Sequence, residues 1–324
     1  MGDSPLVIWA VSDGRAGIAA QAAGLAGAVA RLRPAQVVDK TIAWKGLTGR
    51  LPWRLIPTSA LAAGSGVTPP WPDIWIAAGR ATLPLSTRMR RWSEGRTFVV
   101  QIQHPRAPLS AFDLVIPPRH DQLAGDNVLA ITGAPQRLTP ERLAEARAAF
   151  APRIEPLPGP RIAVLIGGKS RAHDLSETRA AQMGGEIAEA VRRARGSVLV
   201  TYSRRTPGPA RRALTEALKD VPGWIWDETG DNPYFGFLAW ADAVLLTEDS
   251  TNLATEAAFT GKPVHLLYMQ GRSEKLARFH ADLAERGVLR RFAGRIEQWV
   301  YPPLDETGRA AGEVVRRYEA RAAR

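Results

Sequence analysis

The acidic and hydroxylic residues that follow Thr247 are the ones in this chain best suited to hold a ligand. They come directly after the apolar run Asp242–Thr247 and lead into a short Ala-rich segment, which Gly261 ends before Pro263 begins another apolar run. This order predicts a strand, a polar turn, a helix and a second strand. The candidate residues of the turn and of the first turns of the helix are Glu248, Asp249, Ser250, Asn252 and Glu256.

The helix is expected to begin at Ser250 or Asn252, at the carboxyl edge of a parallel sheet. There its N–H groups and positive dipole end favour a phosphate or a sugar hydroxyl. Glu256, about one turn further along, is placed to accept hydrogen bonds from a ribose diol. The segment resembles the nucleotide-sugar segment in the C-terminal domain of two-domain glycosyltransferases of the GT-B type.

Two other loops follow predicted strands in the same half of the chain. In Ile166–Arg171 the letters Gly-Lys-Ser suggest a P-loop, but that motif needs a glycine where Ala163 stands. A short turn in which Gly167, Gly168 and Lys169 approach a diphosphate is the better interpretation. In Thr201–Pro207 the residues that could hold the same diphosphate, or simply lie solvated at a strand end, are Ser203, Arg204 and Arg205.

Aromatic and histidine residues supply further candidates. Tyr234 is predicted to stack on a nucleotide base, with a core position as the alternative. In the first half of the chain, His104, His120 and Asp121 end two successive predicted strands. His104 is a candidate proton carrier, and surface strand ends are the alternative.

The loop Val11–Gly17 links the first predicted strand to the first predicted helix. Gly14 and Gly17 fit a tight turn, which leaves Asp13 and Arg15 to be explained. In a two-domain transferase this loop faces the interdomain cleft. There Asp13 is a candidate general base and Arg15 a partner for an anionic group, with an N-cap as the alternative role for Asp13.

The elements that position these residues form two α/β halves separated by Ala151–Pro160, which has four prolines in ten residues. We expect a first domain over 1–151, a linker over 152–160, a second domain over 161–303 and a helix over 304–324. The predicted class is two doubly wound Rossmann-like domains facing a cleft, with the last helix crossing back to the first. Predicted buried strands before the linker are 6–11, 36–41, 74–78, 97–102, 114–117 and 128–132, and a helix over 140–150 has Thr139 as its N-cap.

Composition narrows the functional classes. With 45% hydrophobic and 23% charged residues the chain is expected to be a soluble protein of the cytoplasm. It has no cysteine and its five histidines show no metal-ligand spacing, so we predict no metal site. The net charge of +11 favours nucleic acid, but the basic residues are spread along the chain, and we predict no such partner.

Tryptophans, leucines and cations alternate between residues 44 and 56. This mixture predicts contact with an anionic membrane surface, and a loop that packs its tryptophans inward is the alternative. The residues concerned are Trp44, Lys45, Leu47, Arg50, Leu51, Trp53 and Arg54.

The motifs in their order resemble those of one family, the mitochondrial-fission "elongated mitochondria" family of plants and its bacterial relatives. They are 12–17 with Gln21, 112–121, 167–169, 203–206 and 247–263, and together they cover nearly the whole chain. Plant members are linked to recruiting a dynamin-like GTPase to mitochondria. The resemblance implies a GT-B type fold with a nucleotide-sugar-like cleft, in which Gly14, Arg15, Gln21, His120 and Asp121 lie on the acceptor side.

The resulting functional prediction is a metal-independent glycosyltransferase on the inner face of the cytoplasmic membrane. It uses a nucleotide sugar, with no tightly bound cofactor, and a lipid or envelope-precursor acceptor, with Asp13 and His104 as catalytic candidates. Two alternatives stay open: a non-catalytic adaptor that recruits a partner protein, and a nucleotide-sugar 2-epimerase.

Overall fold

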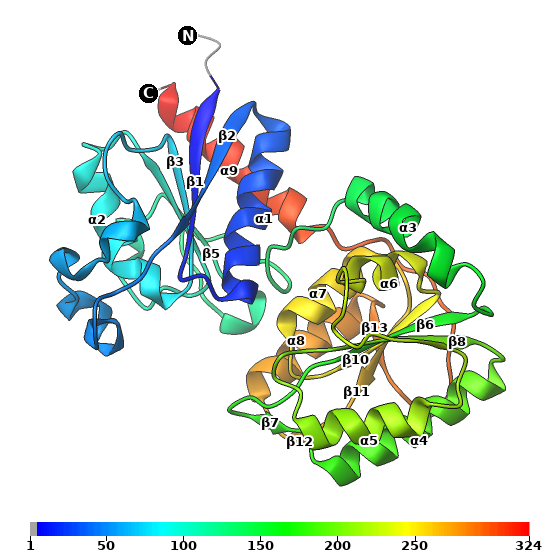
Figure 1. The fold of residues 1–324 in the computed structure, drawn as a ribbon. Helices are drawn as coiled ribbons and strands as arrows, with labels where there is room; N and C mark the ends of the chain where they lie inside the picture. Colours follow the sequence, from blue (N-terminus) through cyan, green and yellow to red (C-terminus); the bar gives the residue numbers. More distant parts are fainter. Residues whose placement is uncertain (1–4, 324) are drawn as a thin grey trace. The chain divides into compact units, whose positions relative to one another are not determined.

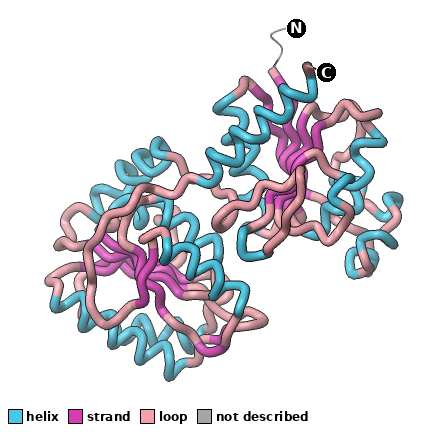
Figure 2. The backbone as a smooth tube through the Cα atoms, turned by 180° about the vertical axis from the view of Figure 1, so that it is seen from behind, coloured by secondary structure: helices cyan, strands magenta, loops and turns pink. Residues whose placement is uncertain are grey.

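The computed structural model describes residues 5–323, which divide into two compact units. Unit 1 contains the chain up to Arg137 together with the segment from Asp305 onward, and unit 2 is Leu138–Leu304. Each unit is a twisted parallel sheet with helices packed on both of its faces (Figures 1 and 2). The two Rossmann-like units confirm the predicted fold class.

Unit 1 is built on a parallel sheet with the strand order β2-β1-β3-β4-β5. Side chains of the central strands alternate between the two faces, as the period of two in a strand requires. Ile8 and Ile76 face a core shared with α1 and α9, whereas Trp9 and Trp75 face a core shared with α2. The elements are β1 (Leu6–Ser12), α1 (Ala16–Leu32), β2 (Ala35–Thr41), β3 (Ile74–Ala78), α2 (Leu83–Trp92), β4 (Phe98–Ile102), β5 (Leu114–Ile116) and α9 (Glu306–Ala322).

Single 3-10 turns occupy much of the connection between β2 and β3 and recur after the later strands of unit 1. They are η1 (Thr48–Arg50), η2 (Trp53–Leu55), η3 (Thr58–Ala60), η4 (Ala63–Ser65), η5 (Arg80–Thr82), η6 (Leu109–Ala111) and η7 (Arg119–Asp121).

Unit 2 has a larger parallel sheet with the order β13-β11-β10-β6-β8-β9 and a short antiparallel pair, β7 with β12. Alternate side chains of β6 pack on opposite layers: Val164 faces α4 and α5, and Leu165 faces α6, α7 and α8. The elements are α3 (Pro140–Ile154), β6 (Arg161–Ile166), β7 (His173–Asp174), α4 (Glu177–Arg193), β8 (Ser197–Tyr202), α5 (Gly208–Leu218), β9 (Gly223–Ile225), α6 (Tyr234–Trp240), β10 (Ala243–Thr247), α7 (Thr251–Phe259), β11 (Val264–Leu267), β12 (Gln270–Gly271), α8 (Glu274–Glu285) and β13 (Leu289–Arg291).

The last helix, α9, crosses back to unit 1, where it packs along α1. Ala310, Ala311 and Val314 are buried in the core that α1 shares with the sheet. Thr307 also accepts a buried hydrogen bond from the Gln136 amide, 3.0 Å between Oγ1 and N. The predicted return of the C-terminal helix is therefore confirmed.

Three sequence predictions about elements were wrong. The segment 128–132 is not a strand, because Pro117 and Pro118 in the segment beside it lack N–H groups. Only isolated bridges at Val128 and Ile131 remain. The second predicted strand is not buried: β2 is an edge strand with most of its side chains exposed or half exposed.

The third difference concerns the boundary between the units. The helix α3 continues through Pro152 to Ile154 and belongs to unit 2, so the units divide at 137/138 and not within 152–160. Proline is tolerated there because it lies in the last turn of the helix, where Glu155 still donates its N–H to Ala151. Thr139 caps the helix as predicted, accepting the Arg142 N–H.

No helix among residues 5–323 is long and apolar enough to cross a bilayer.

Candidate functional site

The candidate site of unit 2 lies at the carboxyl ends of three adjacent strands. In the sheet, β6 is the neighbour of both β8 and β10, so the loops that follow these strands meet at one edge. Gly167, Ser203 and Glu248 are the first residues of the three loops. The structure thus brings together three of the segments that the sequence marked as donor-binding.

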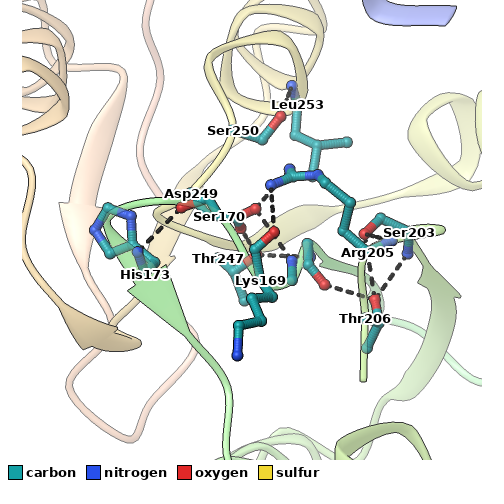
Figure 3. A network of polar contacts seen from close by, with 12 residues as sticks. Lys169, Ser170, His173, Ser203, Arg205, Thr206, Thr247, Asp249, Ser250 and Leu253 are labelled. Carbon is teal, nitrogen blue, oxygen red and sulfur yellow. Dashed lines mark hydrogen bonds and ion pairs between the residues drawn. The ribbon is translucent and has the colours of Figure 1, made fainter. Parts of the chain in front are cut away.

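Asp249 connects these three loops. Its side chain is fully buried, and its carboxylate accepts hydrogen bonds from the Thr247 hydroxyl at 2.8 Å and the Gly168 amide at 3.1 Å (Figure 3). The Arg205 guanidinium supplies the compensating charge, with Nη2 2.7 Å from Oδ2. A buried carboxylate needs such partners, so Asp249 fixes the loop geometry and is not available to a sugar hydroxyl in this state.

The two glycines of the β6 loop have packing reasons for being glycine. A Cβ on Gly167 would stand 1.9 Å from Asp249 Oδ1, and a Cβ on Gly168 would stand 2.1 Å from the Arg205 carbonyl oxygen. The sequence prediction attributed both glycines to close approach of a diphosphate. The structure gives both glycines a packing reason as well, because a side chain at either position would collide with the network around Asp249.

Lys169 and Arg204 are the basic side chains of the site that do not pair with Asp249. Lys169 forms an exposed ion pair with Asp174 at 3.2 Å, which lowers the pKa of Asp174 in addition to the larger effect of the Leu175 N–H. Arg204 is exposed and has no side-chain hydrogen bond or ion pair with any residue in the described part of the chain. Of the two predicted arginines, Arg204 is therefore open to an anion and Arg205 is engaged.

The helix α7 begins where the sequence predicted. Ser250 is its N-cap, and its hydroxyl accepts the Leu253 N–H at 3.4 Å (Figure 3). The first N–H groups of a helix have no acceptor within the helix and carry the positive end of its dipole. The start of α7 therefore adds positive potential beside Arg205 and the glycine turn.

Glu256 on α7 and Tyr234 on α6 contact each other through their side chains. The Tyr234 hydroxyl donates to Glu256 Oε2 at 2.5 Å. Burial, together with the neighbouring carboxylate, raises the pKa of Tyr234 well above its usual value, so the phenol stays protonated and remains a donor. The predicted ribose ligand and the predicted base-stacking residue are thus one hydrogen-bonded pair.

Glu248 lies beside this network, half-buried. Its Oε1 accepts the Met269 N–H at 2.7 Å. Burial raises the pKa of Glu248, while the Met269 hydrogen bond opposes the change. Asn252 occupies the first turn of α7 as expected.

Two residues of the site were missed or undervalued in the sequence. Thr206 donates to the Gly167 carbonyl at 2.5 Å and accepts the Ser203 N–H at 3.0 Å. His173 is buried near Glu248, and its Nδ1 has no hydrogen-bond partner within residues 5–323. The motif 203–206 contained a signal for Thr206, whereas His173 stood outside every strand-end motif.

In unit 1, Asp13 and Arg15 form a local pair. The Arg15 guanidinium donates to Asp13 Oδ2 at 2.9 Å, and Arg15 N donates to Oδ1 at 3.2 Å. The N-cap of α1 is Arg15 and has no side-chain cap, so the alternative role of Asp13 as an N-cap is not observed. Gly14 adopts φ +76°, which agrees with the predicted tight turn.

The other candidates of unit 1 lie at different depths. His104 is exposed, and its Nδ1 accepts the Arg106 N–H at 3.0 Å. Gln21 is buried on α1 and accepts a 3.0 Å hydrogen bond from Gln103 of the β4 loop. His120 is buried on η7 and Asp121 is half-buried beside it. Within the described residues no group of three His, Asp or Glu side chains is arranged to hold a metal ion.

The segment proposed for membrane contact faces two ways. Trp44 and Trp53 are half-buried, and their indole N–H groups donate to the carbonyls of Ala81 at 2.9 Å and Arg106 at 3.4 Å. The tryptophans therefore pack inward, as the alternative interpretation held. The leucines and cations of the segment are exposed: Lys45, Leu47, Arg50, Leu51, Arg54 and Leu55.

Comparison with known proteins identifies the family of the chain. The family model described as mitochondrial fission ELM1 matches residues 16–318, which include parts of both units. The chain belongs to the mitochondrial fission ELM1 family.

Two relatives bracket the range of similarity. The mitochondrial fission protein ELM1 of Arabidopsis thaliana is 36% identical over 277 residues, which are 77% of this chain and 65% of the plant protein. An uncharacterised protein of Rickettsia prowazekii is 26% identical over 282 residues, covering 74% of this chain and 78% of that one. The alignment with the plant protein therefore covers most of this chain but less than two thirds of the plant protein.

Solved structures show the fold that this ELM1 family member shares. A UDP-N-acetylglucosamine 2-epimerase, described as putative, from Listeria monocytogenes superposes with a TM-score of 0.57 at 11% identity, covering 98% of this chain and 97% of the other. The Methanocaldococcus jannaschii 2-epimerase in complex with UDP-GlcNAc and UDP gives 0.50 at 12%, covering 97% and 99%. The glycotransferase of kitacinnamycin gives 0.50 at 13%, covering 98% and 96%. The fold is GT-B-like.

Proposed function

We propose that unit 2 binds a nucleotide sugar with a UDP moiety at the carboxyl edge of β6, β8 and β10. The observation that carries the proposal is the buried Asp249 carboxylate, which holds the glycine turn, Arg205 and the start of α7 in one fixed arrangement. The start of α7 and the cationic side chains at such an edge favour a diphosphate, whereas the N–H groups of the glycine turn are already engaged by Thr247, Asp249 and Arg205. The choice of uridine rests on the UDP-GlcNAc and UDP complex of a protein with the same fold.

The charges around this edge determine which chemistry the site favours. Positive potential comes from the start of α7, Lys169 and Arg204. Within the described residues no acidic side chain pairs with Arg204. Such groups stabilise the negative charge that develops on a departing diphosphate. We therefore propose transfer of the sugar with inversion, without a metal ion, to a lipid or envelope-precursor acceptor at the cytoplasmic face of the membrane.

The ribose contact requires an exchange of partners. Glu256 accepts from Tyr234, and a ribose diol offers two hydroxyl donors of the same kind. A carboxylate that exchanges one neutral donor for two gains a charge-assisted hydrogen bond. In the proposed complex Glu256 turns to the ribose and Tyr234 packs against the nucleotide.

Asp13 is the proposed general base for the acceptor hydroxyl. The Asp13 side chain is largely shielded, with 17% of its surface exposed, whereas the side chain of its partner Arg15 is 68% exposed. A hydroxyl that approaches Asp13 displaces part of this surface ion pair, which costs little. Arg15 remains beside the acceptor as a counter-ion for an anionic group.

The same fold supports a second candidate reaction, inversion at C2 of UDP-N-acetylglucosamine. The fold match to 2-epimerases is the observation that favours it. Incubation of the protein with UDP-N-acetylglucosamine alone separates the reactions, because an epimerase needs no acceptor. Binding without any turnover supports the third alternative, an adaptor with a retained nucleotide site.

The donor site is tested by calorimetry and thermal unfolding with UDP, UDP-N-acetylglucosamine, ADP and GDP. UDP at a hundred times its dissociation constant is expected to stabilise the protein by about 2.7 kcal/mol. Glu256→Gln is expected to lower UDP affinity about ten- to a hundredfold, because a charged hydrogen-bond partner of the ribose is lost.

Tyr234→Phe is the matched control, since it removes the other half of the same hydrogen bond and keeps the ring. It is expected to leave UDP affinity unchanged or higher. Equal losses in the two variants would mean that the pair is structural. Absence of UDP binding by the wild-type protein would refute the donor site.

A further inference from the structure

Unit 1 contains a pocket that none of the predicted donor-side groups line. It has a volume of about 320 Å³ and lies at the carboxyl ends of β3 and β4, where parallel sheets bind ligands. Ligand pockets usually hold ~300–1,000 Å³, so this one accommodates a headgroup or a small molecule. Its lining comes from the η5 turn, the end of β4 and the loop after it, and from Pro52 and Trp53.

The rim of the pocket carries unbalanced positive charge. Arg80 and Arg106 line it, both are exposed, and within residues 5–323 neither side chain has a hydrogen bond or an ion pair. His104 also lines the pocket and lies on the same loop as Arg106. Two guanidinium groups beside an imidazole form a phosphate-binding arrangement, because guanidinium groups hold phosphate oxygens in pairs.

The interior of the pocket contains an unsatisfied acceptor. Gln101 lines the pocket and is 1% exposed; its Nε2 donates to the Ile102 carbonyl at 3.2 Å, while its Oε1 has no partner among the described residues. A buried acceptor without a partner is unfavourable, and a ligand hydroxyl would satisfy it. Gln103 and Arg106 also adopt positive φ angles of 72° and 49°. Such strained conformations concentrate at functional sites.

One wall of the pocket belongs to a surface that is both apolar and cationic. The Trp53 indole N–H donates to the Arg106 carbonyl, and no residue of η1 or η2 is buried. Leu47 is 70% exposed and Leu55 is 65% exposed. Between Asp39 and Asp73 there is no acidic residue, whereas Lys45, Arg50 and Arg54 are all present and exposed.

We propose that this pocket binds the phosphate headgroup of an anionic membrane lipid, while the exposed leucines and cations beside it contact the bilayer surface. Charge complementarity favours an anionic bilayer as the partner, because juxtaposed cations gain roughly 1 kcal/mol each near such a surface. The lipid supplies the phosphate for Arg80 and Arg106 and a hydroxyl for Gln101. We also identify this lipid with the acceptor, and that step rests on the proposed transferase function. The binding of the lipid to the pocket does not depend on it.

The experiment separates pocket from surface. Calorimetry with dihexanoyl phosphatidylglycerol below its micelle concentration measures the pocket alone, because this lipid has both an anionic phosphate and free headgroup hydroxyls. Sedimentation with vesicles of phosphatidylcholine, with and without phosphatidylglycerol, measures the surface. The wild-type protein is expected to bind one monomeric lipid per chain and to sediment only with anionic vesicles.

Arg80→Gln with Arg106→Gln is expected to lower binding of the monomeric lipid about thirtyfold. Leu47→Ser with Leu55→Ser is expected to keep that binding and lose most vesicle binding. The matched controls are Arg192→Gln with Arg212→Gln, which remove the same charge from unit 2, and Leu32→Ser, which removes an exposed leucine of α1. Both controls are expected to behave as the wild type does.

The proposal would be overturned if the arginine variant bound the monomeric lipid and the vesicles as tightly as the wild type does. So would tight binding of inorganic phosphate without vesicle binding, which would make a free phosphate the ligand. UDP binding, measured on the same samples, reports folding and the donor site. If the wild-type protein binds UDP but no lipid, only the lipid pocket is refuted. If it binds the lipid but no UDP, only the donor site is refuted.

Discussion

The loop after the first strand differs between the two units, although it occupies the same place in each fold. In unit 1 this loop, after β1, is held by contacts between neighbours, Asp13 with Arg15, on a surface where Arg15 is mostly exposed. In unit 2 the loop after β6 is held by residues 36 to 81 positions away, among them Arg205 and Asp249. The β6 loop is fixed before any ligand arrives, whereas the β1 loop can adapt to its ligand. A donor with a constant diphosphate suits the fixed β6 loop, and a variable acceptor suits the adaptable β1 loop.

The same substitution of the aspartate that holds each loop, Asp13 for the β1 loop and Asp249 for the β6 loop, tests this contrast, and the larger effect is expected on turnover. Asp13→Asn keeps the shape of the side chain and removes the base, so transfer should fall by roughly two to four orders of magnitude with UDP affinity nearly unchanged. The measurement is the initial rate of sugar transfer once an acceptor is found. Full activity in this variant would remove Asp13 from the catalytic role.

Asp249→Asn is expected to act on stability. It removes the charge-assisted hydrogen bond from Arg205 and puts an amide NH2 group in place of a buried acceptor oxygen, which together cost about 3 kcal/mol. For a unit of this size the unfolding midpoint should fall by roughly 6–12 °C. In Asp13→Asn the change in the free energy of unfolding should stay within about 0.5 kcal/mol, because its ion pair is on the surface. Similar stability losses in both variants would contradict the contrast between the loops.

The smallest expected effect is a pH dependence of stability at the edge of the donor site. Burial raises the pKa of Glu248 from its usual 4.5, so the folded state holds this proton more tightly than the unfolded state does. The contribution to stability is therefore present below pH 4.5 and is lost as the pH rises through the folded pKa. Glu248→Gln should match the wild type at low pH and become the more stable protein at neutral pH, measured by denaturant unfolding at pH 3.5 and 7.5.

Glu313 on α9 provides the opposite sign within the same protein. A hydrogen bond from Arg316, together with Arg317, lowers its pKa to about 2. Its contribution is present above pH 4.5 and is lost as the pH falls toward 2. Glu313→Gln should therefore be less stable than the wild type at neutral pH, and the two proteins should converge on acidification. A shared direction for the two glutamates would refute the assigned causes.

Local chemistry made much of the fold predictable from the sequence. Continuous apolar runs marked β3 at its observed bounds and β4 to within one residue, because strands buried on both faces need no polar alternation. Thr139 and Ser250 were identifiable as helix caps because a cap depends only on the next few residues. The segment 128–132 failed because its pairing depends on Pro117 and Pro118 of another chain segment.

The contacts that define the site were less predictable. Arg205 and Asp249 are 44 positions apart and meet only because β6 lies between β8 and β10 in the sheet. Likewise, Glu256 and Tyr234 were each placed at the donor site, but their mutual hydrogen bond follows from how α6 and α7 pack. Sequence spacing identifies which loops carry chemistry, and strand order decides which side chains neutralise one another.

The return of α9 to unit 1 imposes an order on folding during synthesis. Unit 2 is one continuous stretch, Leu138–Leu304, and can complete its core as soon as that stretch has left the ribosome. Unit 1 cannot do so, because Ala310, Ala311 and Val314 fill its core beside α1. The half of the protein that is made first therefore finishes folding last, and until residues 305–323 emerge the apolar face of α1 is a surface for chaperones to protect.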